Sequence, residues 1–316
     1  MNKLMDILQI KYPIIQGGMG NISNAILTAS ISNAGGLGTI GVGTMDPTEV
    51  EGILTETCTK TKHPFSVNIP ISVTTYVNEM LSLLIKYKVP IVSLSAGNPA
   101  PYIPLLKEHG IKLICVVSSV KQAIKAERAG ADVLVAEGYE AAGINSKLET
   151  TTLTLIPQIV ASVHIPVVAA GGIGDGRGLA AMLALGASGV QMGTRFIATK
   201  EAPFHDRYKE ALVQASDTDT VIVGRSVGKI RRLMNTDYAH KLLQIEKNGT
   251  TLEVFDEMTT EDFHRKGAIE GNLADGFING GQVSGSIQDI PSVEELLTRM
   301  MKEAKEQVTV LSQLLS

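Results

Sequence analysis

A carboxylate stands at the end of an apolar run, and a loop of small and polar residues follows it. The stretch VLVAEGYEAAGINSKLETTT (133–152) carries Glu137 after its apolar residues, then Ile144, Asn145 and Lys147. A carboxylate, an amide and an amine in one loop can bind a polar ligand or move a proton. The loop holds no histidine and no cysteine, so its chemistry depends on what other segments bring to it.

Eight continuous apolar runs, rich in valine and isoleucine, recur along the first 200 residues. They lie at 12–16, 37–41, 65–69, 90–95, 112–117, 131–137, 165–171 and 188–193. Such runs are typical of parallel strands buried on both faces, and amphipathic segments separate them. Eight strand–helix units predict an α/β fold, a closed (β/α)8 TIM barrel, with a doubly wound sheet as the alternative. A Gly-Ala turn before a strand occurs at both 130–131 and 186–187, and this repetition favours the barrel.

The rhythm of the sequence changes after residue 202. Residues 203–266 are more charged, and their pattern predicts helices without buried strands between them. We interpret this part as a small helical lid inserted after the eighth strand of a barrel formed by residues 1–202. Residues 267–316 contain a Gly-rich loop predicted to return to the barrel mouth and a terminal helix with Ser292 as its N-cap.

Two glycine-rich loops follow the seventh and eighth predicted strands. They are AAGGIGDGRG (169–178) and QMGTRF (191–196). In barrels, loops at these two places commonly bind phosphate through backbone N–H groups. The predicted contacts are Gly171, Gly172, Gly193 and Thr194. The segment GLGTIG (36–41) matches the dinucleotide fingerprint only weakly, because its apolar strand lies inside the match.

Polar groups follow other predicted strands at the same face of the barrel. These carboxamides and the carboxylate are Gln16, Asn68, Asn98, Glu137 and Gln191. Together with the phosphate loops they suit a flat, hydrogen-bonding heterocycle that carries a phosphate. Flavin mononucleotide (FMN) fits this set better than a sugar phosphate, which usually recruits lysine and paired carboxylates.

Composition narrows the class of protein. The formal net charge of the 316 residues is −4, which argues against nucleic-acid binding. The one basic cluster is short, and we interpret it as a solvated helix face or as a contact to a nucleotide phosphate; it comprises Arg225, Lys229, Arg231 and Arg232. No apolar run reaches the roughly 20 residues of a membrane span, and the two cysteines indicate no disulfide framework. We expect a cytoplasmic protein without a metal site.

Several ordered motifs resemble those of the nitronate monooxygenase (nitropropane dioxygenase) and enoyl-ACP reductase II family. They are YPIIQGGMG, AGGLGTIG, FSVNI, AGNP, AEGYEAAG, AAGGIGDGRG and GVQMGTRF. The resemblance implies a TIM barrel with a lid and a non-covalent FMN. It places the cofactor on Gly18, Met19, Asn68, Glu137, Gly171, Gly172, Gln191, Met192, Gly193, Thr194 and Gln282. A homodimer is a further expectation at the level of the family.

The sequence departs from that family at one position. Relatives carry Gly-Gly-His shortly after the sixth strand, and that histidine is their proposed catalytic residue. An alignment without gaps puts Ile144 there, so Asn145 and Lys147 become the candidate catalytic residues. Among the six histidines, the predicted topology places His205 near the mouth and His264 in the lid.

Three functions are compatible with this reading. The first is an FMN-dependent oxidoreductase that uses NADH or NADPH and a small-molecule or acyl-chain acceptor, because hydride transfer to a flavin needs orientation and no protein base. The second is nitronate or enoyl chemistry with a replacement for the histidine, and the third is a flavin-binding barrel without turnover. An IMP dehydrogenase-like barrel is set aside, because the loop after the sixth strand lacks a nucleophilic cysteine.

Overall fold

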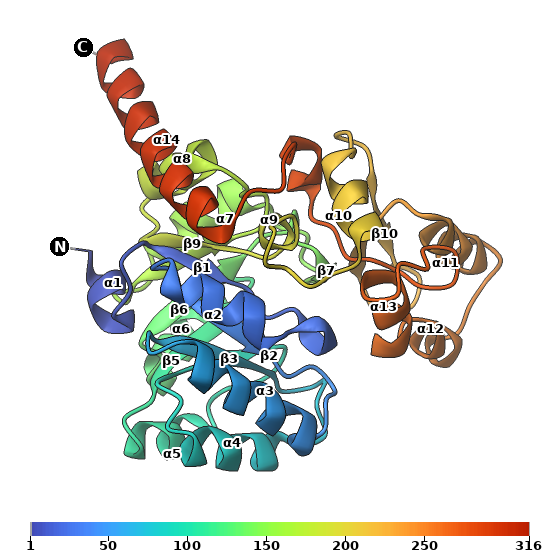
Figure 1. Ribbon diagram of the computed structural model, residues 1–316, viewed down its shortest axis with the longest axis horizontal. Helices are drawn as coiled ribbons and strands as arrows, with labels where there is room; N and C mark the ends of the chain where they lie inside the picture. The colour runs from blue at the N-terminus through green and yellow to red at the C-terminus, as the bar shows by residue number, and fades with distance from the viewer. Residues whose placement is uncertain (1, 316) are drawn as a thin grey trace.

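Eight parallel strands with helices around them form the larger part of the molecule in the computed structural model (Figure 1), which describes residues 2–315. The strands are β1 (Ile14–Gln16), β2 (Gly38–Gly41), β3 (Phe65–Pro70), β4 (Ile91–Ser95), β5 (Lys112–Val117), β6 (Val133–Glu137), β8 (Val167–Ala170) and β9 (Gly189–Met192). Each falls within or beside one of the predicted apolar runs. The eight predicted strands are therefore confirmed.

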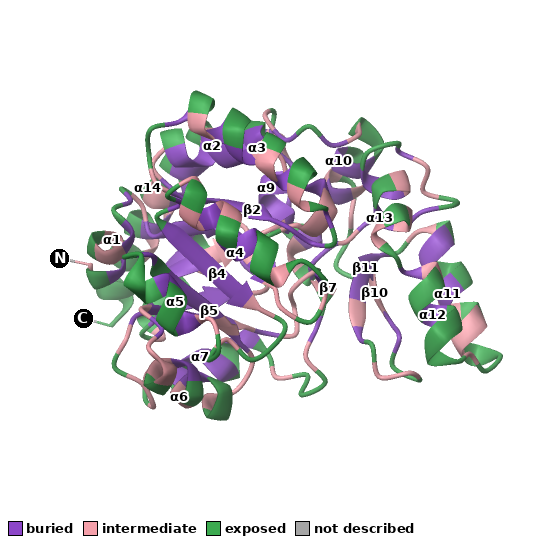
Figure 2. Cartoon of the chain, turned by 90° about the horizontal axis from the view of Figure 1, so that it is seen from below, coloured by how far each residue is buried: buried purple, intermediate pink, exposed green. Residues whose placement is uncertain are grey.

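The strands close into a barrel. Their order is β1-β9-β8-β6-β5-β4-β3-β2, and all the pairs are parallel. A parallel bridge between Ile15 and Leu37 joins the two ends of this order. Figure 2 shows the strands almost entirely buried, as continuous apolar runs require. The TIM barrel is confirmed, and the doubly wound sheet is wrong.

Helices cover the outside of the barrel (Figure 1). They are α1 (Lys3–Leu8), α2 (Ala25–Asn33), α3 (Pro47–Lys60), α4 (Val77–Lys86), α5 (Ile103–Glu108), α6 (Val120–Ala129), α7 (Thr152–Val160), α8 (Gly176–Ala184) and the short α9 (Thr194–Ile197). Except in α9, which is buried throughout, their outer faces are exposed and their inner faces are buried (Figure 2). The 3₁₀ helix η1 (Gly20–Ile22) follows β1 and η2 (Gln282–Ser286) precedes the last helix.

The terminal helix α14 (Val293–Leu314) packs on the barrel against α8 and α2. Ser292 caps it, and Glu295 completes a capping box, which confirms the predicted start. The contact with α8 depends on Gly176, where a Cβ atom would lie 2.4 Å from the carbonyl oxygen of Met300. No helix within residues 2–315 is long and apolar enough to cross a membrane.

The chain between β9 and α14 forms the lid beside the barrel mouth. It contains α10 (Asp206–Val213), α11 (Asp237–Lys247), α12 (Leu252–Met258) and α13 (Glu261–Ala268). It also contains two strands, β10 (Thr220–Val223) and β11 (Arg231–Met234), so the prediction of helices alone is wrong on this point. A small apolar cluster of its own, around Tyr238, Phe255 and Phe277, stabilises this part.

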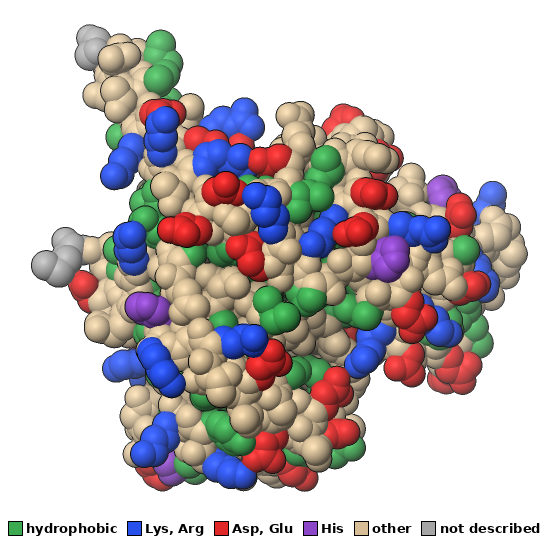
Figure 3. Space-filling model, in the orientation of Figure 1, with side chains coloured by type: hydrophobic (Ala, Val, Ile, Leu, Met, Phe, Trp, Pro, Cys, Tyr) green, Lys and Arg blue, Asp and Glu red, His purple; other side chains and the backbone are tan. Residues whose placement is uncertain are grey.

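The new strands connect the lid to the loop after β6. Strand β11 pairs antiparallel with β10 on one side and with β7 (Gly143–Ile144) on the other. The basic cluster therefore lies on a β-hairpin, and its interpretation as a helix face is wrong. On the face in Figure 3, acidic and basic side chains are interspersed, so no broad basic surface gathers there.

Candidate functional site

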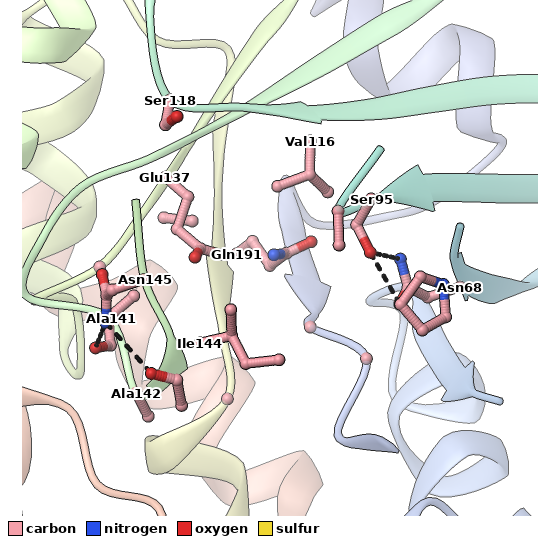
Figure 4. A pocket seen from close by; sticks show the side chains of 18 of the residues that line it. Asn68, Ser95, Val116, Ser118, Glu137, Ala141, Ala142, Ile144, Asn145 and Gln191 are labelled. Atoms are coloured by element: carbon pink, nitrogen blue, oxygen red, sulfur yellow. Dashed lines mark hydrogen bonds between the residues drawn. The ribbon is translucent and has the colours of Figure 1, made fainter. Parts of the chain in front are cut away.

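A large cavity opens at the carboxyl ends of the barrel strands. Its volume is about 1160 Å³. Strand ends and their loops form its floor, the loop after β6 forms one wall, and lid residues from β11, α13 and the returning segment form another. Figure 4 shows Glu137, Gln191 and Ile144 around its centre, with Asn68 and Ser95 on one side and Asn145 on the other. Active sites of TIM barrels lie at this face.

The cavity collects nearly all of the residues that the sequence predicted for a cofactor. Those that line it are Gly18, Met19, Asn68, Glu137, Gly171, Gly172, Gln191, Met192, Gly193 and Thr194. Gln16 and Gln282 are the exceptions. Gln16 is buried, and its Oε1 accepts from the N–H of Thr39 at 3.0 Å. The side chain of Gln282 is exposed, and its backbone N–H donates to the carbonyl of Glu140 at 3.0 Å. The structure instead brings its neighbours Gly281 and Val283 to the cavity. The binding roles of these residues stay predictions.

Glycines at the cavity floor allow backbone conformations and close approaches that a side chain would prevent. Gly171 and Gly172 have φ values of 101° and 75°, which residues with a side chain rarely adopt. At Gly193 a Cβ atom would meet nothing within 4 Å, so the loop after β9 leaves room there for a ligand. At Gly18 a Cβ atom would lie 2.8 Å from Oδ1 of Asn68. These positions form a floor to which an anion and a flat ring can come close.

Hydrogen bonds hold this floor in place. The Asn68 amide donates to the hydroxyls of Ser93 and Ser95, both at 3.1 Å. Thr194 Oγ1 accepts from the N–H of Gly281 at 3.0 Å, which ties the loop after β9 to the returning segment. A site held in this way is organised before its ligand arrives.

Glu137 ends β6 and lies inside the cavity. Burial raises its pKa from the ordinary 4.5 to about 7. Since the folded state favours the protonated form, folding binds a proton between these two values, and the protein loses stability as the pH rises through that window. Above pH 7 the cost of the ionised carboxylate is fully present.

We expect Glu137→Gln to stabilise the FMN-free protein at high pH. The gain should be near zero at pH 4 and roughly 1–3 kcal/mol at pH 8, because the amide has no charge to desolvate. Urea unfolding at the two pH values measures it, with the exposed Glu56→Gln as the control. An equal effect of Glu137→Gln at pH 4 and pH 8 would contradict the raised pKa of Glu137.

The loop after β6 shows what its candidate residues do. The Asn145 amide donates to the carbonyls of Ala141 (2.8 Å) and Gly143 (3.4 Å), and its backbone N–H donates to Ile230 of the lid. Asn145 therefore shapes the loop and joins it to the lid. Lys147 lines the cavity with an exposed side chain, and Ile144 lines it while half exposed.

A histidine of the lid reaches the cavity. His264 on α13 is 2 % exposed; its Nδ1 lies 3.4 Å from Glu261 Oε2, and its Nε2 lies 3.1 Å from the Asn279 amide nitrogen. Burial raises the pKa of Glu261, but the hydrogen bond to His264 and the charges of His264 and Arg231 outweigh it, and the pKa is lowered. Glu261 is thus held as a carboxylate beside the imidazole.

The expectation for His205 differs from the structure. His205 caps α10, where its Nδ1 accepts from the N–H of Arg207 at 3.1 Å, and it does not line the cavity. The contact of α13 with η1 brings His264 there instead. Sequence reasoning placed His264 in the lid without a role, because no local pattern tells which lid helix faces the barrel.

Comparisons with known proteins agree with this architecture. The family model for nitronate monooxygenase matches residues 1–80 and 69–303. A probable nitronate monooxygenase of Staphylococcus saprophyticus is 34% identical, with 96% of this chain and 98% of the relative covered.

Two further relatives carry other names. A Rhodococcus jostii protein named (3aS,4S,5R,7aS)-5-hydroxy-7a-methyl-1-oxo-octahydro-1H-indene-4-carboxyl-CoA dehydrogenase is 31% identical, with 98% of each chain covered. The solved structure of FabK from Thermotoga maritima superposes with a TM-score of 0.95 at 42% identity, with 99% of each chain covered. The chain belongs to the nitronate monooxygenase family and is an oxidoreductase of that family.

Proposed function

We propose that the protein is an FMN-dependent oxidoreductase that takes electrons from NADH or NADPH and passes them to a small-molecule or acyl-chain acceptor. The observation that carries this proposal is one cavity that combines a glycine-rich floor with carboxamides and lid residues. Its volume of about 1160 Å³ exceeds the range of about 300–1,000 Å³ typical of a single ligand, which leaves room for a cofactor and a substrate.

The residues present fit an FMN. Gly171, Gly172, Gly193 and Thr194 offer backbone groups for its phosphate, at the two loops where barrels bind phosphate. Asn68, Glu137 and Gln191 offer hydrogen-bond groups for the polar edge of its ring. The flavin supplies the hydride chemistry, and the chain binds it, orients the second ligand and limits the access of water.

The test of this function is spectroscopic. The purified protein, directly or after reconstitution with FMN, should show a flavin absorbance spectrum that NADH or NADPH bleaches without oxygen. A protein that stays colourless after reconstitution contradicts the proposal. Bound flavin that neither nicotinamide reduces would favour the non-catalytic flavin-binding barrel.

A second candidate function is supported by His264. Enoyl or nitronate chemistry benefits from an acid or base at the cavity. The loop after β6 has no histidine to fill this role, but the Glu261–His264 pair of the lid lines the cavity. This candidate predicts that His264→Gln lowers crotonyl-thioester or propionate-nitronate turnover by about 10- to 100-fold while flavin reduction is kept. Lys147→Ala is the comparison for the loop; an unchanged rate in His264→Gln rejects the candidate.

The remaining expectations rest on the family. The Rhodococcus relative is named for a carboxyl-CoA compound, which is compatible with an acyl-chain acceptor here. The cytoplasmic location and the homodimer stay predictions.

A further inference from the structure

One arginine of the basic hairpin differs from its neighbours. Three of the four cluster residues have partners in the protein and do not line the cavity. Arg225 forms an ion pair with Glu149 at 3.3 Å, and Lys229 forms one with Asp256 at 3.5 Å. Arg232 donates to the carbonyl of Tyr139 at 3.0 Å. Arg231 does line the cavity, and its side chain has neither a hydrogen bond nor an ion pair within residues 2–315. The one cavity-facing member is thus the one without a partner.

The position of Arg231 is fixed by the fold. It lies opposite Ile144 in the β11–β7 pairing, so both side chains are on the same face of the small sheet. Its guanidinium lies 5.6 Å from the centre of the Phe277 ring. The same ring also stacks on His264. Strand pairing and this ring contact hold the charged group at the wall of the cavity.

Among residues 2–315, no acidic side chain neutralises Arg231 by direct contact. Burial lowers its pKa, opposed by the charges of Glu261 and Asp256, yet a guanidinium stays protonated at neutral pH. The carboxylate of Glu261 is hydrogen-bonded to His264 and not to Arg231. Both carboxylate oxygens of Glu140 accept from Thr152 at 2.9–3.0 Å.

Arg231 is half-buried at the cavity wall, so its charge is only partly solvated by water, and an incoming anion would compensate it. Lys147 adds a second positive charge on the loop that pairs with β11, and it too has no ion pair among the described residues. Two cations on adjoining walls of one cavity, joined by the β7–β11 pairing, suit a group that carries up to two negative charges. A phosphate has that charge, whereas a carboxylate has one.

This wall is separate from the floor assigned to the FMN phosphate. That floor comes from the loops after β8 and β9, whereas Arg231 comes from the lid and Lys147 from the loop after β6. We propose that Arg231, assisted by Lys147, binds a phosphate group of the second ligand. This proposal, which rests on the proposed function, makes that ligand a nucleotide-bearing one, either a nicotinamide dinucleotide or a coenzyme A thioester.

Calorimetric titration of the FMN-loaded protein tests the proposal. The probes are NADP⁺, NAD⁺, crotonyl-coenzyme A, and crotonyl-N-acetylcysteamine, which has no phosphate. We expect Arg231→Gln to weaken at least one phosphate-bearing probe by about 10- to 100-fold, as the loss of a charged hydrogen-bond donor predicts. Arg231→Lys should lose less, and the phosphate-free probe should change less than about twofold.

The control removes the same charge from the lid outside the cavity. Arg265→Gln serves, because Arg265 is exposed, pairs with Glu49 on α3 and does not line the cavity. Flavin content and circular dichroism confirm that each variant is folded.

The pattern of losses identifies the source of the phosphate. Loss for NADP⁺ alone indicates the 2′-phosphate of the dinucleotide, and loss for both dinucleotides indicates their diphosphate. Loss for crotonyl-coenzyme A indicates a phosphate group of coenzyme A. The proposal is overturned if the wild-type protein binds no phosphate-bearing probe, or if Arg231→Gln binds the probes as Arg265→Gln does. It is also overturned if Arg231→Gln weakens FMN binding as much as it weakens binding of the probes. Should the protein bind no FMN, the proposed function fails, while the same titrations on the FMN-free chain still decide the role of Arg231.

Discussion

Gly193→Leu is expected to abolish FMN binding in a protein that still folds. The φ of Gly193 is −113°, which any residue adopts, and a Cβ atom there meets no protein atom within 4 Å. A leucine side chain would therefore fill the space in which the cofactor phosphate is proposed to lie. We expect the affinity for FMN to fall by at least about 100-fold, because the chain must distort or the phosphate must move. Fluorescence titration of the FMN-free protein measures this loss.

The matched control is another glycine with open space around it. Gly52 is exposed on α3, and a Cβ atom there also meets nothing within 4 Å. Gly52→Leu should keep FMN binding and slightly stabilise the helix, by roughly 0.5–1 kcal/mol. If Gly193→Leu keeps the cofactor with unchanged affinity, the phosphate is not bound at the loop after β9.

The barrel was predictable because its signals are local. Continuous apolar runs such as KLICVV and IPVVAAG can only be buried on both faces, and eight of them with intervening helices leave few arrangements. The carboxyl ends of parallel strands meet at one face, so Asn68, Glu137 and Gln191 had to lie near one another. The positions of the strand ends were therefore enough to predict most of the residues of the cavity floor.

The lid was less predictable because its contacts are not local. Strand β11 begins with Arg231 and Arg232, so it lacks the apolar run that indicates a strand, and its partner β7 has only two residues. The pairing of these strands depends on a contact between segments nearly 90 residues apart. The same contact determines that Arg231 faces the cavity while Arg232 bonds to Tyr139, a distinction that spacing cannot give.

The pairing of lid and loop has a consequence for position 144, where the family resemblance implies a histidine. Ile144 is on β7, and its pairing with Arg231 fixes its direction toward the cavity. Its side chain is 50% exposed, so the position tolerates a polar residue without loss of core packing. The histidine that the family resemblance implies at this position would therefore fit the same frame.

Ile144→His is accordingly expected to raise crotonyl-thioester or propionate-nitronate turnover by about 10- to 100-fold, the lower part of the range for a positioned acid or base. Flavin reduction by NADH or NADPH should stay unchanged, because that half-reaction uses no protein acid. For enoyl reduction the gain should decline as pH rises through about 6.5, where the introduced imidazolium loses its proton, and the facing Arg231 shifts this decline to lower pH. Stopped-flow measurement of the two half-reactions separates the effects, with Ile144→Gln as the polar control that cannot donate as an acid. Equal gains in turnover for Ile144→His and Ile144→Gln would mean that polarity at this wall matters and proton transfer does not. No gain in either variant would mean that the acceptor reacts elsewhere in the cavity, beside the Glu261–His264 pair.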